Sequence, residues 1–424
     1  MMKKTILHLA AVAALTLGCA SAALAEGSAP SPYSMKGYGL LNDRTSSTQR
    51  AMGGVGYAMR SSKQINVMNP ASYAAIDTMT FLFDIGLDVG TLRMSEGAVS
   101  ENRTLGGLDY ITMQVPIGRY MGASLGLVPY SSVNYSFGSE VVNGENQYQG
   151  SGGLNELYLG VAGRPFKGFS IGANVSYVFG TLLHDTYATA DDGSTSLYEG
   201  AYEVRDYNLT FGAQYSLQLN KRNTLTAGLT YGIPKNFHGH CYGVTYNQIS
   251  STTSTQQNDT IGYASLKNGF SMPETWGAGL NYEFDNRLMV EADFTYQPWS
   301  KAKFAGIEGF SVSQTGKFVD RYRGAFGVQF TPKTRGNYLK RISYRAGAYY
   351  CRDYMTYGAD DNKVKEYGVS VGFGLPTPVR TTVNLGFEYK HRTTSPVKMV
   401  SENYFTVTLG ISLNEAWFMP SKIY

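Results

Sequence analysis

Charged residues, cysteines and long apolar runs are all scarce in this sequence. Lys, Arg, Asp and Glu make up 16% of its 424 residues, and only three residues are cysteines. Beyond the N-terminus, no apolar run reaches the roughly 18 residues that a membrane-spanning helix needs. The low charge argues against a soluble protein of this size, and the short apolar runs argue against a helical membrane protein. The net charge of +4 is small and dispersed, so no nucleic-acid partner is predicted.

Glycine and tyrosine are abundant instead, with 49 and 33 residues. From Thr78 onward the chain alternates: in its last segment Phe405 and Val407 fall on one side, and Thr406 and Thr408 on the other. The polar side carries mostly Ser, Thr, Gly and Asn, whereas a soluble sheet would carry Lys and Glu there. We therefore predict a transmembrane antiparallel β-barrel, with a soluble β-sandwich as the alternative.

About fourteen segments have strand character, and this even number would place both termini on the periplasmic side. The segments are 78–93, 106–118, 120–138, 152–165, 169–188, 196–219, 223–237, 270–284, 287–300, 316–331, 338–355, 363–375, 381–394 and 403–415. Short turns alternate with long polar links, the longest at 236–269 and another at 185–196. Because short turns are periplasmic in such barrels, the long links are predicted to be external loops.

The two ends of the chain resemble targeting signals. Residues 1–25 have the basic head, apolar core and small-x-small cleavage site of a secretory signal peptide. Lipoprotein processing at Cys19 is an alternative. The last strand closes on the aromatic pair 417–418, which is typical of strands that barrel-assembly machinery recognises. The predicted location is the outer membrane of a Gram-negative bacterium.

The stretch 51–77 differs from everything after it. It is rich in glycine, breaks at Asn69-Pro70, and has neither a helical period nor sustained alternation. We interpret it as a compact segment set inside the barrel. The predicted division is a signal peptide at 1–25, an N-terminal hatch at 26–77, the barrel at 78–418 and a short tail at 419–424.

This stretch resembles the hatch of the outer-membrane FadL/TodX family of hydrophobic-compound transporters. The resemblance is carried by Gly53, Gly54, Gly56, Asn69, Pro70 and Ala71, in that order ahead of the strands. The stretches 31–34 and 69–81 are similar to a Bacteroidetes-type branch of that family.

The resemblance implies a fourteen-stranded barrel closed by the hatch. It implies passive uptake of hydrophobic or amphipathic small molecules, such as long-chain fatty acids, through lumen binding, hatch movement and lateral release at a kink in the third strand. The expected partners are a small hydrophobic ligand, outer-membrane lipid and lipopolysaccharide, and barrel-assembly machinery during biogenesis, with a monomeric barrel. A general porin for polar solutes and a structural or adhesive barrel are the alternatives, because the longest link is rich in Ser, Thr, Gln and Asn.

The third segment contains a proline at a lipid-facing position. Proline cannot donate to a strand ladder, so it belongs at an edge, a bulge or a bend. We predict that Val128, Pro129 and Tyr130 mark the lateral opening. A proline at the barrel rim, without functional consequence, is the alternative.

Face assignment also places charges in the lumen. Two acids on one segment and four arginines on the next two are predicted to point inward: Glu291, Asp293, Arg321, Arg323, Arg341 and Arg345. Charges facing hydrocarbon would cost roughly 2–4 kcal/mol each, which supports this orientation. These residues would form either an internal ladder of ion pairs or a grip for a ligand carboxylate.

An enzyme is not predicted. Beyond the signal the sequence has four histidines, and His238 and His240 beside Cys241 lack a fourth ligand for a metal. No metal and no cofactor is therefore predicted. Cys241 and Cys351 are left as either a disulfide or two isolated thiols.

Overall fold

The computed structural model describes residues 30–416, except for 142, 192, 250–256, 304–316, 334–335, 359 and 379. The predicted signal peptide, Cys19, the aromatic pair 417–418 and the predicted tail at 419–424 lie outside the described residues. No helix within the described ranges is long and apolar enough to cross a membrane.

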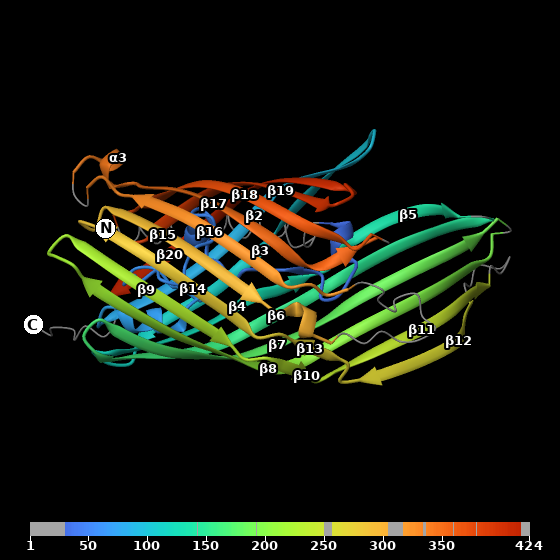
Figure 1. Cartoon of the computed structure of the whole chain (residues 1–424), viewed down its shortest axis with the longest axis horizontal. Coiled ribbons are helices and arrows are strands. Elements are labelled where there is room, and N and C mark those ends of the chain that lie inside the picture. The colour runs from blue at the N-terminus through green and yellow to red at the C-terminus, as the bar shows by residue number, and fades with distance from the viewer. Residues whose placement is uncertain are drawn as a thin grey trace, which may run out of the picture.

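Fourteen strands form a closed antiparallel barrel (Figure 1). Each strand pairs with the next in the order given, and β20 pairs with β2 to close the wall. The strands are β2 (Thr80–Glu96), β3 (Val99–Pro116), β4 (Met121–Ser132), β6 (Gly144–Phe166), β7 (Phe169–Ala190), β8 (Thr195–Gln218), β9 (Asn223–Gly232), β14 (Thr275–Phe284), β15 (Leu288–Gln297), β16 (Arg321–Phe330), β17 (Ser343–Tyr357), β18 (Asn362–Pro376), β19 (Thr382–Ser395) and β20 (Ser401–Ala416). The predicted barrel and its number of strands are confirmed.

Alternation along each strand separates a lumen side from a lipid side. In β20, Phe405 is 49% exposed, whereas its neighbour Tyr404 is 3% exposed. Apolar side chains such as Leu229 and Val371 are likewise exposed on the outside of the wall. A bilayer is the solvent that accommodates such a surface, because the backbone polar groups are paired within the wall.

Part of the wall continues as an extended sheet at the long-loop end, on the right of Figure 1. There β5 (Tyr135–Val141) pairs with β6, and the hairpin of β11 (Gly239–Ile249) and β12 (Gln257–Lys267) pairs with β8. At its base β10 (Lys235–Phe237) pairs with β13 (Phe270–Met272).

The extended sheet corrects two predictions. The link at 236–269 is largely strand, and the link at 185–196 is reduced because β7 continues to its end at Ala190 and β8 begins at Thr195. The run of Ser, Thr, Gln and Asn at 250–260 resembles a loop in composition, whereas the backbone of β11 and β12 pairs with neighbouring strands. Several strand boundaries also differ. The segment 120–138 divides into β4 and β5, and the segment 338–355 begins as the short helix α3 (Tyr338–Arg341).

The N-terminal residues lie inside the barrel, where Figure 1 shows them in blue. Their elements are η1 (Pro32–Ser34), β1 (Leu40–Leu41), α2 (Ser47–Arg50) and η2 (Pro70–Ala75). Tyr38, Met52 and Ala71 are each 0% exposed. Ser46 and Gln49 cap α2 reciprocally, each side chain bonding the other's backbone amide. We call residues 30–77 the lumen segment.

Glycine permits the lumen segment to touch the wall. A Cβ on Gly347 of β17 would lie 2.1 Å from the carbonyl carbon of Met52, closer than any real contact. Gly53 adopts a φ of +69°, which is costly for residues with a Cβ. Near the long-loop end the lumen is packed with aromatic rings, including Tyr38, Trp299 of η3 (Trp299–Lys301) and Tyr354.

Candidate functional site

Two wall carboxylates hold the backbone of the lumen segment. Asp293 accepts hydrogen bonds from the backbone amides of Gly56 at 2.6 Å and Tyr57 at 2.9 Å. Glu291, two residues earlier on β15, accepts one from the amide of Ala58 at 2.9 Å. Both carboxylates are buried, at 7% and 0% exposure. The wall therefore supplies the acceptors that three successive buried amides need.

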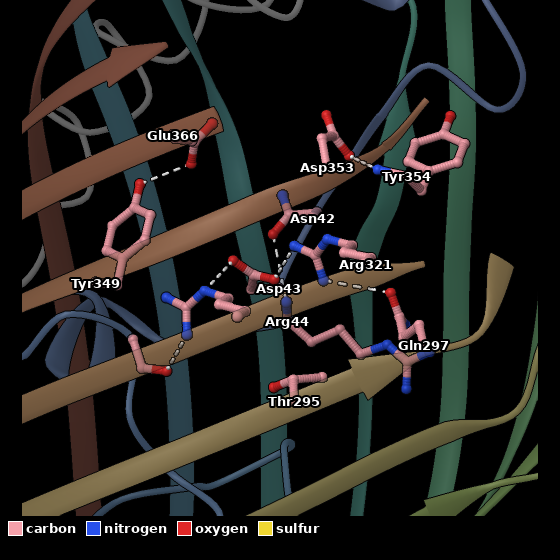
Figure 2. Close-up of polar contacts among 12 residues, drawn as sticks. Asn42, Asp43, Arg44, Thr295, Gln297, Arg321, Tyr349, Asp353, Tyr354 and Glu366 are labelled. Carbon is pink, nitrogen blue, oxygen red and sulfur yellow. Dashed lines mark hydrogen bonds and ion pairs between the residues drawn. The ribbon is translucent and has the colours of Figure 1, made fainter. Parts of the chain in front are cut away.

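Two wall arginines hold the same segment from β16. Arg321 Nη2 and Arg323 Nε lie 2.7 and 2.9 Å from the two carboxylate oxygens of Asp43 (Figure 2). Arg323 also donates to the carbonyl of Gly53 at 2.8 Å. Burial alone raises the pKa of Asp43, but the guanidinium groups of Arg323 and Arg321 lower it by more, so its pKa lies below the ordinary value. We call Asp43, Arg321 and Arg323 the arginine clamp.

These contacts show whether the inward-facing acids and arginines of the wall form a ladder of ion pairs with each other. Within the described ranges, no ion pair joins Glu291 or Asp293 to an arginine, so a ladder between neighbouring strands does not form. The acids bind backbone amides, and Arg321 and Arg323 bind an acid of the lumen segment. Sequence periodicity could place these side chains inward, but it contains no information on what the irregular lumen segment offers them.

The other two arginines lie towards the short-turn end. Arg345 is 5% exposed and donates to Gln329 and Asn384, and no carboxylate in the described part of the chain lies within ion-pair distance of it. The expectation that Arg341 lies on a strand is wrong, because this residue ends α3. Both arginines line a cavity of about 700 Å³ that also includes Arg60 and Arg380.

The motif Asn69-Pro70-Ala71 lies in the lumen against β7 and β8. Asn69 caps η2 by accepting from the amide of Ala71 at 3.1 Å, and its side-chain nitrogen donates to the carbonyls of Tyr57 at 2.7 Å and Ala213 at 3.3 Å. The backbone of Pro70 lies against Gly172. The motif therefore fixes the end of the lumen segment to the wall just before β2.

The wall is incomplete between β3 and β4. These strands pair from Pro116↔Gly122 to Ile111↔Leu127, and no further pair between them occurs in the described residues. The rest of β3 pairs with β2 alone. On its other side β4 stays paired with β6, with an irregular register between Pro129 and Ser131. We call the unpaired stretch the β3–β4 gap.

The lumen segment covers one edge of this gap. Leu40 and Leu41, which form β1, pair with Ser132 and Ser131 of β4. The amide of Asn42 then donates to the carbonyl of Tyr130 at 2.9 Å. The three residues that the sequence singled out therefore lie at the gap: Val128 and Tyr130 are buried, and Pro129 lines the cavity behind it.

A cavity of about 490 Å³ lies behind the gap. It reaches from Leu105, Gly107 and Leu108 on β3 and Pro129 on β4 to the arginine clamp. Its charged residues are Asp43, Arg50, Asp88, Asp109, Arg321, Arg323, Asp353, Glu366, Glu388, Lys390 and Arg392. Most of these charges were not identified from the sequence, although the alternation that assigns an inward side to Glu291 gives the same side to Glu388, Lys390 and Arg392.

Ion pairs neutralise several of these charges. Arg50 binds Asp109 at 2.7 Å. Arg392 binds Glu366 at 2.6 Å and Glu402 at 3.1 Å. Lys390 lies over the ring of Tyr404, 4.2 Å from its centroid, and has no ion pair in the described part of the chain.

The two cysteines in the described residues are both free thiols. Cys351 lines the charged cavity, whereas Cys241 belongs to the aromatic cluster near the long-loop end. Both are free and buried, so the alternative of a disulfide is excluded. In the described ranges, no group of three His, Cys, Asp or Glu side chains could hold a metal ion.

The whole chain matches a protein-family model. The family model described as BamG matches residues 1–424. The chain belongs to the BamG family. Comparison of this BamG-family chain with curated proteins gives no match.

Solved structures share its fold. A Pseudomonas aeruginosa FadL homologue is 13% identical, with a TM-score of 0.61 and coverage of 87% of this chain and 98% of that chain. The P. putida toluene transporter TodX is 14% identical, with a TM-score of 0.60 and coverage of 91% and 100%. The CymD monoaromatic hydrocarbon channel is 14% identical, with a TM-score of 0.56 and coverage of 88% and 98%. The predicted resemblance to the FadL/TodX fold is confirmed, and the Bacteroidetes-type branch stays a prediction.

Proposed function

We propose that this protein is an outer-membrane channel through which amphipathic small molecules pass sideways between the barrel lumen and the bilayer. The β3–β4 gap is the observation that carries the proposal. An unpaired strand edge at membrane depth is tolerated only where it borders protein or a wet cavity. Here it borders the charged cavity, which connects the gap with the lumen.

The lumen segment acts as the hatch of this channel. It blocks the barrel along its axis and is held by the arginine clamp and by the two carboxylates of β15. Gly53 and Gly54 line the charged cavity, so a molecule bound there would contact the hatch beside the clamp. A ligand shifts an equilibrium between two states only by binding one of them more tightly. Ligand binding would therefore move the hatch between its closed and displaced positions through these contacts alone.

The solved neighbours include a toluene transporter and a monoaromatic hydrocarbon channel by title. The charges in this cavity favour an amphipathic molecule, such as a fatty acid, over a pure hydrocarbon, since burying charges beside an apolar ligand is unfavourable. Passage is passive in this proposal.

Narrowing the gap tests the proposal. An added Cβ on Gly107 has Asp88 Oδ1 at 4.0 Å as its nearest atom, so Gly107→Trp can enter the gap without a backbone clash. Gly324 of β16 also has open space and lines none of the cavities described, which makes Gly324→Trp the matched control. Uptake of a fluorescent long-chain fatty acid into proteoliposomes should fall to the protein-free level with Gly107→Trp and stay at the wild-type level with Gly324→Trp. Unchanged uptake with both variants would contradict lateral passage.

The family name favours a second candidate function, because BamG carries the prefix of the barrel-assembly machinery. In this alternative the protein assists the assembly of other outer-membrane barrels. The extended sheet would then be the surface that binds a partner protein. Depletion separates the two candidates. Depletion that lowers the amounts of many other outer-membrane barrels but leaves fatty-acid uptake unchanged would favour assembly. Depletion that abolishes fatty-acid uptake alone would favour the channel.

A further inference from the structure

We propose that the cavity behind the β3–β4 gap binds the zwitterionic head of a membrane amphiphile, one that carries an ammonium and a phosphate group, while its acyl chain remains in the bilayer. This inference rests on the proposed lateral passage and narrows its substrate class. It concerns the head of the molecule, which neither the fold nor the family match specifies.

The cavity combines two kinds of boundary. On the side of the gap it is lined by Leu105 and Leu108 of β3 and by Pro129 of β4. Leu108 is 38% exposed and therefore belongs to the lipid-facing surface. On the other side it is lined by charged side chains of β2, β3, β16, β17, β18 and β19 and of the lumen segment. An amphiphile matches such a boundary, because its head and chain require opposite surroundings.

Ion pairs within the cavity leave a defined set of charges for a ligand. The clamp pairs Asp43 with Arg321 and Arg323, and other pairs occupy Arg50, Asp109, Glu366 and Arg392. Asp88 has no ion pair or side-chain hydrogen bond within the described ranges, and Glu388 accepts only from the hydroxyl of Tyr349, at 2.9 Å. Lys390 has only its ring contact with Tyr404. Asp353 also lines the cavity without an ion pair in the described chain and accepts from the backbone amide of Tyr354 at 2.8 Å. The remaining charges are thus three carboxylates and one ammonium.

Three of these side chains lie close together on the wall, those of Asp88, Glu388 and Lys390. Asp88 of β2 is opposite Thr408 of β20, and Glu388 of β19 is opposite Thr406 of the same strand. Lys390 follows Glu388 on the same side of β19, opposite Tyr404. The carboxylates of Asp88 and Glu388 and the ammonium of Lys390 therefore flank a short stretch of β20 from its two sides.

A zwitterion fits this arrangement better than a ligand of one charge. The ligand's ammonium can donate to Asp88 and Glu388, and its phosphate can accept from Lys390 as a charge-assisted hydrogen bond. A fatty-acid carboxylate would meet Lys390 but also two carboxylates, and a hydrocarbon would desolvate all three groups without replacing their hydration. Asp109 also has an oxygen without a hydrogen-bond partner in the described chain, and its side chain is 94% buried at the cavity wall.

Binding to the purified full-length barrel tests the inference. The probes are lysophosphatidylethanolamine, palmitate and toluene, measured by calorimetry in the same detergent. We expect lysophosphatidylethanolamine to bind most tightly and Lys390→Met or Asp88→Asn to weaken its binding by about tenfold, the effect of losing one charge-assisted hydrogen bond. Lys390→Arg should largely restore binding. The exposed residues Lys398 and Asp191 supply the matched controls Lys398→Met and Asp191→Asn, which should bind like the wild type.

The outcomes separate the inference from the function on which it rests. Palmitate or toluene binding as tight as lysophosphatidylethanolamine, unaffected by the charge variants but abolished by Gly107→Trp, would overturn the zwitterion and leave lateral passage standing. Binding of none of the probes, together with fatty-acid uptake unaffected by Gly107→Trp, would overturn both. Heat-modifiable migration of each variant in gels reports whether the barrel has folded. A variant that fails this check is replaced by the milder Glu388→Gln, for which the same loss of lysophosphatidylethanolamine binding is expected.

Discussion

Asp293 on the barrel wall accepts a hydrogen bond from the backbone amide of Gly56, 2.6 Å away in the lumen. The same carboxylate oxygen accepts from the amide of Tyr57 at 2.9 Å. These two bonds join a wall strand to the backbone of a segment 237 residues earlier in the chain. The hydroxyl of Tyr57 adds a side-chain hydrogen bond to Thr295 of the same strand at 2.9 Å. At Gly56 the lumen segment is held by its backbone alone, so the residue at this position is constrained by shape more than by chemistry.

Replacing this acceptor should loosen the hatch locally. In Asp293→Asn the charge is lost and the amide presents only one accepting oxygen, so we expect about 1–3 kcal/mol less protection of the amides near Gly56. Hydrogen exchange on the detergent-solubilised barrel measures this directly. The control is Asp320→Asn, since Asp320 accepts from Ser300 outside the lumen segment. Equal protection in both variants would show that the wall carboxylate does not hold the hatch.

The arginine clamp should withstand mild acid. The pKa of Asp43 is below its ordinary value of about 4, because Arg323 and Arg321 outweigh the effect of burial. A carboxylate with a lowered pKa in the folded state stabilises that state above its unfolded pKa, and this stabilisation is lost as the pH falls through the folded pKa. Conductance of single barrels in planar bilayers should therefore stay unchanged from pH 8 to about 5. Channel opening that begins near pH 6 would contradict this role of Asp43.

The close contact between Gly347 and Met52 gives a steric prediction. In Gly347→Val the new side chain would occupy the place of the Met52 backbone, so the lumen segment must move at a cost of about 1–3 kcal/mol. Limited proteolysis of the folded barrel should then cleave within residues 50–60 more rapidly than in the wild type. Gly324→Val is the matched control, because its Cβ meets no atom within 4 Å. Resistance equal to that of this control would mean that the hatch does not rest on Gly347.

Pro129 gives a prediction about the gap itself. In Pro129→Val the backbone gains an amide that can extend the ladder of β4, so we expect fatty-acid uptake to fall while assembly of the barrel stays intact. Pro116→Val is the control, because Pro116 lies where β3 and β4 are already paired. Full uptake by the Pro129 variant would make this residue a proline of the barrel wall without a role in passage.

The parts of the fold that follow a period were predictable from the sequence. The inward side of Glu291 and Asp293 follows from their apolar neighbours on β15, because hydrocarbon does not accept charges. Their partners were not predictable, since residues 43–58 have no period and their positions are set by contact with the whole wall. The hairpin of β11 and β12 was missed for a related reason, because outside the bilayer neither side of a strand needs to be apolar.

The lining of the charged cavity was predictable only in part. Lys390 and Arg392 could have been placed inward by alternation on β19, yet the cavity also requires Asp43 and Arg50 from the lumen segment. The set of residues that line the cavity therefore depends on how the lumen segment packs against the barrel wall. No local sequence pattern predicts that packing.

The pairing of β1 with β4 makes the lumen segment part of the wall at the gap. Leu40 and Leu41 belong to the lumen segment and at the same time continue the sheet at the gap. If the lumen segment moves along the barrel axis with these residues, the edge of β4 at Ser131 and Ser132 loses its partner. Movement of the lumen segment and exposure of this edge of the gap are thus coupled, because the same two residues take part in both.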